Sequence, residues 1–486
     1  MNFYVISKML GLLVMTVGAS MLPAWGWTFY YRDGGGWAIF FSMLVSLVMG
    51  GVLFYIGQRG NKDFFRREAI AVVGLGWLVV AGVGALPFYF YGAFPTFIDC
   101  YFESMSGFTT TGASVLVDYE ALPKGLLFWR SFTHWLGGMG IIVLFVALLP
   151  LLGAGGRALM KSEVPGPVTE TLTPKVKDTA VVLWKLYCFF TIAQTIALRI
   201  CGLSWFDSFC HTFATLATGG FSTHPDSVGG YDNLPAEMVI VIFMLIAGTN
   251  FSLYYGVFRG KPLTLFKDPE WRGYIGIVAV STLFVMLVLR YSGTYATMGT
   301  SFRYAFFQVP TLMTTTGFST ANFDLWPGVT KLLLVILMFI GGCAGSTGGG
   351  IKVVRWIILV KAGFHEVERI FSPRTVRRLR LGKMPLQREL VGQVQIFFFL
   401  WVSVLIIGIL AVTLLEGSQH DLETSVTMVV ATLNNIGPGL SEVGAIGNYA
   451  GFNGATKMVL SLLMVLGRLE LYSILVLFAP HFWRGK

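Results

Sequence analysis

Apolar runs long enough to cross a lipid bilayer recur along the whole chain, separated by short polar segments. A helix needs about 20 apolar residues to cross the hydrocarbon core. We expect two such helices near 3–24 and 35–57, followed by four units of one pattern: a long helix, a short apolar segment and a second long helix. The units are 68–92, 97–109 and 126–153; 181–203, 205–216 and 236–258; 273–292, 300–314 and 330–360; and 391–415, 421–433 and 455–480.

The short segments are too short to span the membrane. We interpret them as re-entrant helices, because irregular backbone at membrane depth is tolerated only around a protein-lined or water-filled cavity. Composition supports a membrane protein, since apolar residues make up 55% of 486 positions and charged residues 12%. Soluble domains carry about 25% charged residues.

The charges are distributed unevenly between the two sets of loops. The net charge of +10 does not indicate nucleic acid, because basic residues concentrate in alternate loops, as expected for cytoplasmic loops. We therefore expect both termini in the cytoplasm and an acidic outer mouth that concentrates cations. The basic loops hold Arg59, Lys62, Arg66, Arg67, Arg157, Lys161, Lys175, Lys177, Arg259, Lys261, Lys267, Arg272 and the stretch from Lys352 to Arg388. The acidic loops hold Asp99, Glu103, Asp118, Glu120, Asp207, Asp226, Asp232, Asp324, Glu416, Asp421, Glu423 and Glu442.

A related glycine-containing motif follows each short segment. The four motifs read FTTTGAS (108–114), LATGGFST (216–223), MTTTGFST (313–320) and LNNIGPGL (433–440). A half-crossing helix points its negative C-terminal end at the membrane centre, glycine permits the backbone that follows to turn its carbonyls inward, and threonine adds hydroxyl oxygens. Rings of carbonyls replace the hydration shell of a cation, so we predict a four-part selectivity filter. Its residues are Thr110, Thr111, Gly112, Ala113, Ala217, Thr218, Gly219, Gly220, Thr315, Thr316, Gly317, Phe318, Asn435, Ile436, Gly437 and Pro438.

The motifs are similar but not identical. Aligning Gly112, Gly219, Gly317 and Gly437 places Ala113, Gly220, Phe318 and Pro438 after them, and asparagines replace the threonines in the fourth motif. We expect approximate symmetry and fewer well-formed ion sites than in a tetrameric channel. The predicted fold is an all-α polytopic membrane protein with two N-terminal helices (1–67) and four helix–pore loop–helix repeats around one pore in pseudo-four-fold arrangement. The repeats are 68–155, 156–260, 261–390, with an interrupted inner helix and a basic cytoplasmic segment, and 391–486.

A second glycine cluster lies within the inner helix of the third repeat. Six glycines between Gly341 and Gly350 should break this helix into a loop, since each weakens a helix by about 1 kcal/mol relative to alanine. We interpret the loop as a gate below the filter; close packing through small residues is the alternative. Arg468 lies in the last inner helix and is expected to face the pore or hold the loop closed, with pairing to a carboxylate as the alternative. The gate residues are Gly345, Ser346, Thr347, Gly348, Gly349, Lys352 and Arg468.

Other classes of site find little support in the sequence. Lys352 follows GGGI rather than forming the GK[ST] of a phosphate-binding loop, and the six histidines show no metal-ligand spacing. No nucleophile motif indicates an enzyme. Asn250 is expected to be either a cavity ligand or an interhelical hydrogen-bonding group. Sodium- or proton-coupled symport by alternating access remains the alternative to a channel, although four motifs on one side do not fit inverted repeats.

At these motifs the chain resembles the Trk/Ktr/HKT superfamily of cation transporters, most closely its bacterial Trk-type (TrkH/TrkG-type) uptake subunits. The resemblance covers essentially the whole length. Its most specific marks are the four filter motifs and three runs: GGCAGSTGGGIKVVR (341–355), RSFTHWLGGMGIIV (130–143) and LGRLELY (466–472).

The resemblance implies properties that the residues alone do not establish. It implies four pore-loop units, transport of potassium, a homodimer, a cytosolic nucleotide-binding ring of the TrkA type as partner, and a bacterial inner-membrane location. Because serine at the first filter glycine accompanies sodium preference in some plant members, Gly112 indicates potassium. The fourth motif departs most from the family pattern.

Overall fold

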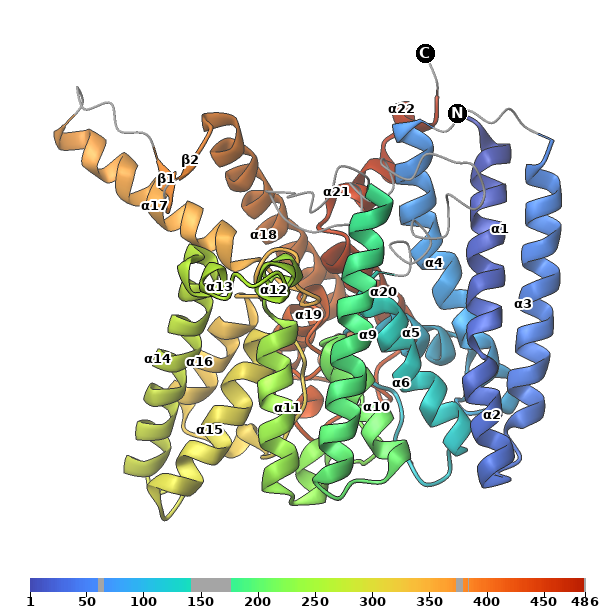
Figure 1. The fold of residues 1–486 in the computed structure, drawn as a ribbon, viewed down its shortest axis with the longest axis horizontal. Coiled ribbons are helices and arrows are strands. Elements are labelled where there is room, and N and C mark those ends of the chain that lie inside the picture. The colour runs from blue at the N-terminus through green and yellow to red at the C-terminus, as the bar shows by residue number, and fades with distance from the viewer. Residues whose placement is uncertain (60–64, 141–175, 373–378, 383, 485–486) are drawn as a thin grey trace.

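The computed structural model describes residues 1–59, 65–140, 176–372, 379–382 and 384–484. Within these ranges nearly every regular element is a helix, and one two-stranded hairpin joins β1 (Arg380–Leu381) to β2 (Met384–Pro385). The two chain termini lie at the same end of the molecule (Figure 1). The predicted all-α fold is confirmed.

The N-terminal helices form a tightly packed pair at the edge of the bundle (Figure 1). Helices α1 (Phe3–Ser20) and α2 (Leu22–Tyr31) together make one candidate span, and α3 (Gly36–Gly57) returns beside them. A Cβ at Gly11 would lie 2.6 Å from the Gly50 carbonyl oxygen, so small residues set this close approach. The span predicted to end at 24 therefore continues to Tyr31.

Each of the four repeats contains an outer helix, a short pore helix and an inner helix. The first has α4 (Arg66–Tyr91), α5 (Phe97–Phe108) and α6 (Lys124–Gly138); the second α9 (Val176–Ile200), α10 (Trp205–Leu216), α11 (Leu234–Ala247) and α12 (Phe251–Phe258); the third α14 (Pro269–Tyr291), α15 (Met298–Met313), α16 (Gly328–Met338) and α17 (Val353–Phe371); and the fourth α18 (Arg388–Glu416), α19 (Leu422–Leu433), α20 (Gly454–Arg468) and α21 (Tyr472–Leu475). Short helices α13 (Leu263–Lys267) and α22 (Pro480–Trp483) complete the described α-helices.

The inner helices are more broken than the sequence suggests. The third is interrupted between Met338 and Val353, as predicted, but the second also bends by 97° between α11 and α12, and the fourth by 119° between α20 and α21. At the first bend Asn250 caps α12 by accepting a hydrogen bond from the Ser252 N–H (2.9 Å). At the other, Glu470 and Leu471 adopt positive φ. The first inner helix, predicted to reach 153, ends at Gly138, and 141–153 lie outside the described residues.

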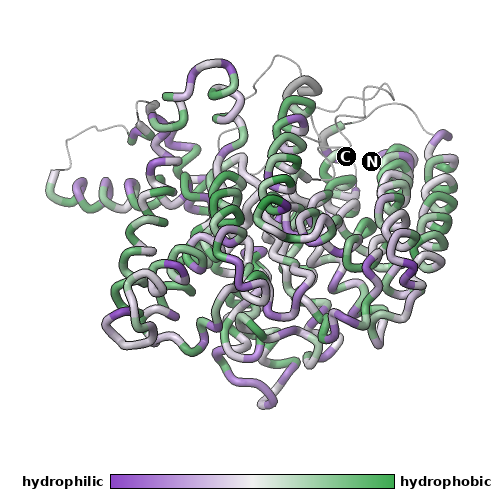
Figure 2. Tube along the Cα trace, turned by 60° about the horizontal axis from the view of Figure 1, so that its bottom comes forward, coloured by the Kyte–Doolittle hydropathy of each residue, from purple (hydrophilic) through white to green (hydrophobic). Residues whose placement is uncertain are grey.

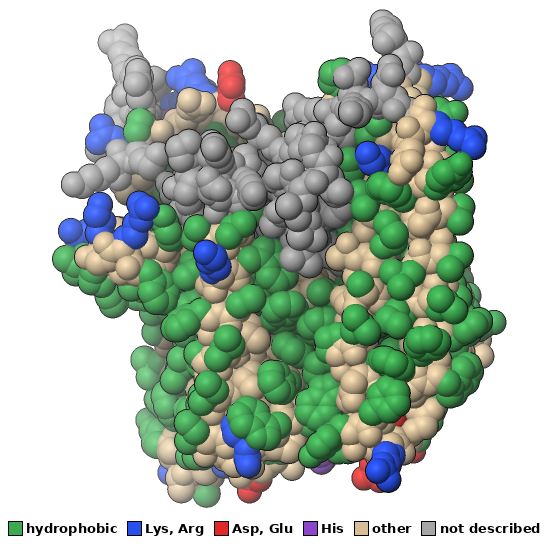
Figure 3. Space-filling view, turned by 45° about the vertical axis from the view of Figure 1, so that its right-hand side comes forward, with side chains coloured by type: hydrophobic (Ala, Val, Ile, Leu, Met, Phe, Trp, Pro, Cys, Tyr) green, Lys and Arg blue, Asp and Glu red, His purple; other side chains and the backbone are tan. Residues whose placement is uncertain are grey.

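The surface agrees with a membrane environment. Six helices in the described ranges are long and apolar enough to span a bilayer, or up to eight if each bent pair counts as one span. Hydrophobic residues dominate the helices, and polar residues gather near their ends (Figure 2). Hydrophobic side chains cover the middle of the face in Figure 3, and many Lys and Arg side chains lie at its upper end.

Candidate ion pathway

The four pore helices start in the same way. A side-chain oxygen at the N-cap accepts a hydrogen bond from a backbone N–H three residues later, which satisfies one of the free donors of the first turn. The donors and acceptors are Asp99 N to Thr96 (3.2 Å), Asp207 N to Ser204 (3.0 Å), Thr300 N to Thr297 (3.1 Å) and Thr424 N to Asp421 (2.9 Å). The predicted helix at 205–216 has the observed bounds.

The pore helices also end in the same way, with a left-handed residue that turns the chain. This residue is Thr110 (φ 54°), Thr218 (φ 56°), Thr315 (φ 61°) and Asn435 (φ 56°). The next N–H donates back into the helix, from Thr111 to Ser106 O (2.9 Å), Gly219 to Ala214 O (2.7 Å), Thr316 to Thr311 O (2.8 Å) and Ile436 to Ala431 O (2.9 Å). This is the Schellman arrangement, in which glycine is usual.

Three threonines at this turn make the backbone strained. A β-branched residue at positive φ is an outlier that costs about 1–3 kcal/mol and persists only where the surroundings enforce it. The same conformation recurs at Thr110, Thr218 and Thr315. Glycine would form the turn without this strain, and strained turns of this kind cluster at functional sites.

A second left-handed position lies two residues further on and is glycine in all four repeats. The φ values are 82° at Gly112, 81° at Gly220, 81° at Gly317 and 94° at Gly437. The conformation therefore aligns Gly220, not Gly219, with the other three glycines. The sequence alignment was wrong here because two adjacent glycines offer two registers. With the corrected register the following residues are Ala113, Phe221, Phe318 and Pro438.

These glycines link the four motifs into a closed ring. A Cβ at Gly112 would overlap the Gly219 carbonyl oxygen, one at Gly220 the Thr316 oxygen and one at Gly317 the Ile436 oxygen. A Cβ at Gly437 would lie 2.7 Å from the Thr111 oxygen, which returns to the first repeat. Each glycine thus faces the carbonyl of the residue before the equivalent glycine in the next repeat. The ring requires glycine for both its φ and its space.

Several threonine hydroxyls in the filter motifs make hydrogen bonds within the protein. The Thr109 and Thr111 hydroxyls lie 2.8 Å apart, and those of Thr314 and Thr316 lie 2.7 Å apart. In the second repeat the Thr218 hydroxyl donates to the Ala217 carbonyl (2.6 Å). In the fourth repeat the Asn435 amide donates to the Thr111 hydroxyl (3.0 Å) and the Met464 carbonyl (2.8 Å). The fourth repeat is therefore hydrogen-bonded to the first through Asn435, where the other repeats have threonine.

A vestibule of about 500 Å³, including its open mouth, lies over the glycine ring. All four aligned glycines line it, together with side chains from the segments that follow each filter motif. Among its lining residues, all within the described chain, none is a carboxylate: they are Gly112, Ala113, Ser114, Tyr119, Arg130, Gly220, Ser222, His224, Pro225, Ser227, Gly317, Ser319, Gly437, Pro438, Val443, Gly444, Ala445, Gly447 and Tyr449. Backbone oxygens and helix C-termini, rather than acidic side chains, supply the negative potential at this depth.

Several of the acidic residues expected at the mouth are instead held in ion pairs. Buried Glu103 pairs with Arg130 (2.5 Å), and Arg130 also donates to the Ser222 carbonyl (2.9 Å) of the second filter motif. The Asp207 carboxylate instead accepts hydrogen bonds from the Ser204 and Thr223 hydroxyls (2.6 Å each).

Among the residues that the structure describes, charge pairs cross three of the four boundaries between neighbouring repeats. Each joins the fourth residue of an inner helix to the pore helix of the next repeat. They are Glu237 with Arg303 (2.7 Å), Lys331 with Glu423 (3.5 Å) and Lys457 with Asp99 (2.6 Å). The inner helix supplies the acid in the first pair and the base in the other two. At the boundary between repeats one and two the fourth residue of α6 is Leu127.

The glycine-rich segment of the third inner helix forms a loop beneath the filter. Its limbs meet where the Gly341 N–H donates to the Ile351 carbonyl (3.0 Å) and the Val353 N–H to the Gly342 carbonyl (3.2 Å). The loop touches the filter base, because the Gly349 N–H donates to the Thr315 hydroxyl (2.7 Å) and the Thr347 hydroxyl to the Leu216 carbonyl (2.8 Å). The expected interruption is confirmed, and the loop lies directly against the filter.

Arg468 joins the loop to the first repeat. Its guanidinium donates to the Thr347 carbonyl (2.7 Å), the Gly137 and Gly138 carbonyls (2.6 and 2.7 Å) and the Thr110 hydroxyl (3.1 Å). Lys352 is buried and its ammonium donates to the Gly348 carbonyl within the loop. The predicted gate residues therefore lie together below the filter.

Two carboxylates that sequence reasoning missed also hold this region. One Glu270 oxygen accepts hydrogen bonds from the N–H groups of Ala344 (2.8 Å) and Val354 (3.0 Å), so it bridges the two limbs of the loop. Glu470 pairs with Arg355 at the start of α17. No sequence signal marked Glu270, because an acidic residue in the first turn of a helix is common.

Comparison with known proteins places this architecture in a family. The TrkH family, described as cation transport proteins, matches residues 35–484. The chain is 41% identical to the Trk system potassium uptake protein TrkH of Salmonella typhimurium over 100% of both chains. It is 34% identical to TrkG of Escherichia coli over 99% of both. The crystal structure of the potassium transporter TrkH from Vibrio parahaemolyticus superposes with a TM-score of 0.89 at 37% identity, covering 100% of both chains. With a family match over nearly its full length and full-length relatives, this chain belongs to the TrkH family of cation transport proteins.

Proposed function

We propose that this protein is a potassium uptake channel with a four-part glycine filter and an intramembrane gate loop. The observation that carries the proposal is the closed ring in which each of four left-handed glycines faces a carbonyl of the next repeat. Potassium as the ion rests on similarity to the potassium uptake proteins named above and on glycine at position 112.

The filter would select by replacing water with backbone oxygens. Four pore helices end directly before the ring, so their negative ends favour a cation at its centre. Carbonyl oxygens held by strained turns replace the hydration shell at little reorganisation cost. A bare ion would thus pass from the vestibule through the ring toward the loop.

The loop would close the pathway below the filter until it is moved. The Arg468 guanidinium places a positive charge beside the Thr347 carbonyl and the Thr110 hydroxyl, where it opposes a passing cation. Helix α17 begins directly after the loop and carries basic residues away from it (Figure 1). We expect a cytosolic nucleotide-binding ring of the TrkA type to pull on this helix, in a homodimer whose termini face the cytoplasm of a bacterial inner membrane. Lys and Arg side chains are more numerous at the upper end in Figure 3, the end at which Figure 1 places both termini, and this agrees with the orientation.

Ion flux into liposomes tests the proposal directly. Purified protein should carry potassium when a voltage is the only driving force, with no proton or sodium gradient. Empty liposomes provide the baseline. If flux appears only when a proton or sodium gradient is imposed, the protein is a coupled symporter, which is the alternative function, and the channel proposal fails.

Loss of the Glu270 bridge should weaken the gate. Glu270→Ala removes the shared acceptor of Ala344 and Val354 N–H groups, so the two limbs of the loop lose their common anchor. We expect flux without the cytosolic partner to rise about tenfold, since two buried hydrogen bonds are lost. Glu270→Gln keeps an acceptor oxygen and should restore most of the closure. Equal flux from Glu270→Ala and the unmodified protein would contradict the role.

A further inference from the structure

Tyr449 makes a contact with the filter that sequence reasoning did not anticipate. It lies in the segment between the fourth filter motif and α20, it is 2% exposed and it lines the vestibule. Its hydroxyl donates a hydrogen bond to the carbonyl of the filter residue Gly437 (2.8 Å). Its backbone N–H donates to the Ser114 carbonyl (2.8 Å) at the end of the first filter motif. One residue therefore fastens the first and fourth motifs together.

The hydroxyl contact makes the glycine ring asymmetric. Gly112, Gly220 and Gly317 occupy the same left-handed position as Gly437 and line the same vestibule. Within the described part of the chain, the carbonyl oxygens of these three accept no hydrogen bond, whereas that of Gly437 is occupied by Tyr449. Of the four oxygens, only that of Gly437 thus accepts a hydrogen bond from a side chain of the described ranges.

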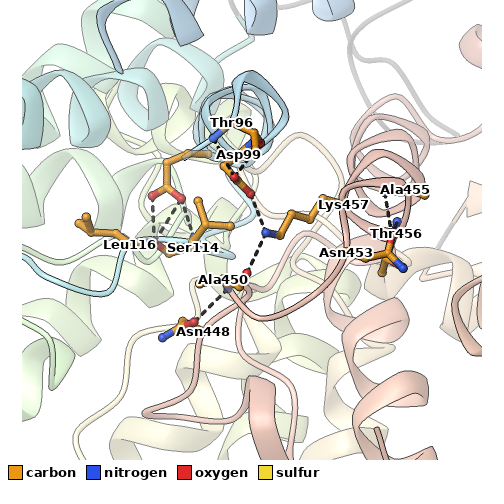
Figure 4. Close-up of polar contacts among 12 residues, drawn as sticks. Thr96, Asp99, Ser114, Leu116, Asn448, Ala450, Asn453, Ala455, Thr456 and Lys457 are labelled. Atoms are coloured by element: carbon orange, nitrogen blue, oxygen red, sulfur yellow. Dashed lines mark hydrogen bonds and ion pairs between the residues drawn. The ribbon is translucent and has the colours of Figure 1, made fainter. Parts of the chain in front are cut away.

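A clamp between the first and fourth repeats fixes the segment that carries Tyr449 (Figure 4). The Lys457 ammonium donates to the Asp99 carboxylate (2.6 Å) and to the Ala450 carbonyl (2.9 Å), the residue after Tyr449. Asp99 is itself fixed in the capping box of α5 with Thr96. The tyrosine ring also packs against Phe102, with ring centroids 5.5 Å apart. The backbone around Tyr449 and its ring are therefore both fixed, and this holds the hydroxyl in place.

We propose that Tyr449 is a specificity-determining residue that lowers the field strength of the outermost ion position. A donated hydroxyl proton reduces the negative potential at the Gly437 oxygen and holds its direction. Ligands of weaker field favour a larger cation, because a smaller one must give up more tightly held water. The inference rests on the proposed function of the glycine ring as a cation filter.

The substitution Tyr449→Phe isolates the hydroxyl, because the ring and its packing remain. We expect the ratio of potassium to sodium permeability in proteoliposomes to fall about fivefold, the ratio that corresponds to one hydrogen bond of ordinary strength. Tyr101→Phe is the matched control: its hydroxyl donates to the Leu78 carbonyl (3.4 Å) on the outer helix, away from the vestibule. An unchanged ratio in Tyr449→Phe, or an equal fall in both variants, would overturn the inference.

The clamp supplies a second, independent measurement. Asp99→Asn weakens the hold of Lys457 on Ala450, so the permeability ratio should fall in the same direction. If Asp99 acts through Tyr449, the double variant should show no further fall beyond Tyr449→Phe alone. Full additivity would show that Asp99 does not act through the hydroxyl and would remove the clamp from the proposal.

The outcomes separate this inference from the proposed function. If the unmodified protein carries no potassium, or carries sodium equally well, the filter proposal fails and the role of Tyr449 with it. If the unmodified protein prefers potassium and Tyr449→Phe keeps the full preference, the filter stands and only the role of Tyr449 is lost.

Discussion

Serine in place of Gly317 or Gly112 should remove selective potassium uptake. Both glycines have φ near 80°, where a side chain is strained, and at both a Cβ would overlap a carbonyl oxygen of the next repeat. The new side chain must push that carbonyl out of the ring, so one substitution disturbs two repeats. We expect the growth of an uptake-deficient cell at low potassium to be lost for Gly317→Ser. For Gly112→Ser we expect the preference for potassium over sodium to fall at least about tenfold, the ratio given by 1.4 kcal/mol.

A glycine with the same backbone but no neighbour provides the control. Gly293 has φ 75°, and no atom lies within 4 Å of the position of its Cβ. Gly293→Ser therefore carries the conformational strain without the collision, and it should keep uptake and selectivity. Full rescue with intact selectivity in both filter variants would mean that the ring is not the filter.

Removing Arg468 or shortening the loop should open the pathway. Arg468→Ala deletes the donor to the Thr347, Gly137 and Gly138 carbonyls and the positive charge below the filter. A charged hydrogen bond that holds a loop contributes about 1.5–3 kcal/mol, so we expect flux without the partner to rise at least about tenfold. Deleting residues 345–349 should have the same effect, and flux should depend less on the partner in both variants.

Arg199→Ala serves as the matched control for Arg468→Ala. Arg199 also donates to a backbone carbonyl, that of Leu203 (3.1 Å), but it lies at the end of an outer helix. Its loss should leave flux unchanged. Slower or unchanged flux in Arg468→Ala would contradict a closing role for this arginine, and unchanged flux after the deletion would exclude the loop as the gate.

The fold followed from sequence because its signals are local. Long apolar runs and the capping residues Thr96, Ser204, Thr297 and Asp421 mark the spans and pore helices without help from distant contacts. The breaks in the second and fourth inner helices were missed because each occupies only about three residues inside an apolar run. A change in backbone direction there depends on contacts such as those of Arg355 with Glu470, which lie 115 positions apart.

The left-handed glycines lie where the sequence aligned them, except in the second motif, where the composition is ambiguous. In the sequence ATGG either glycine matches the TTTG pattern. Only the left-handed conformation of Gly220 shows which of the two corresponds to the glycines of the other motifs. The roles of Glu270 and Tyr449 could not be predicted at all. Glu270 contacts backbone atoms far away in the chain, and Tyr449 lies in a loop without a periodic pattern. Residue spacing in the sequence does not predict such contacts.

The reversed charge pair between the second and third repeats has a consequence for how the ring closes. Four similar repeats in one chain have several possible circular orders, and apolar packing alone distinguishes them poorly. If the second and third repeats exchanged places, Glu237 would face Glu423, so that two carboxylates would meet. Like charges in contact oppose such an arrangement. The reversed sign thus disfavours any order in which the second repeat directly precedes the fourth, and so acts against one class of folding error.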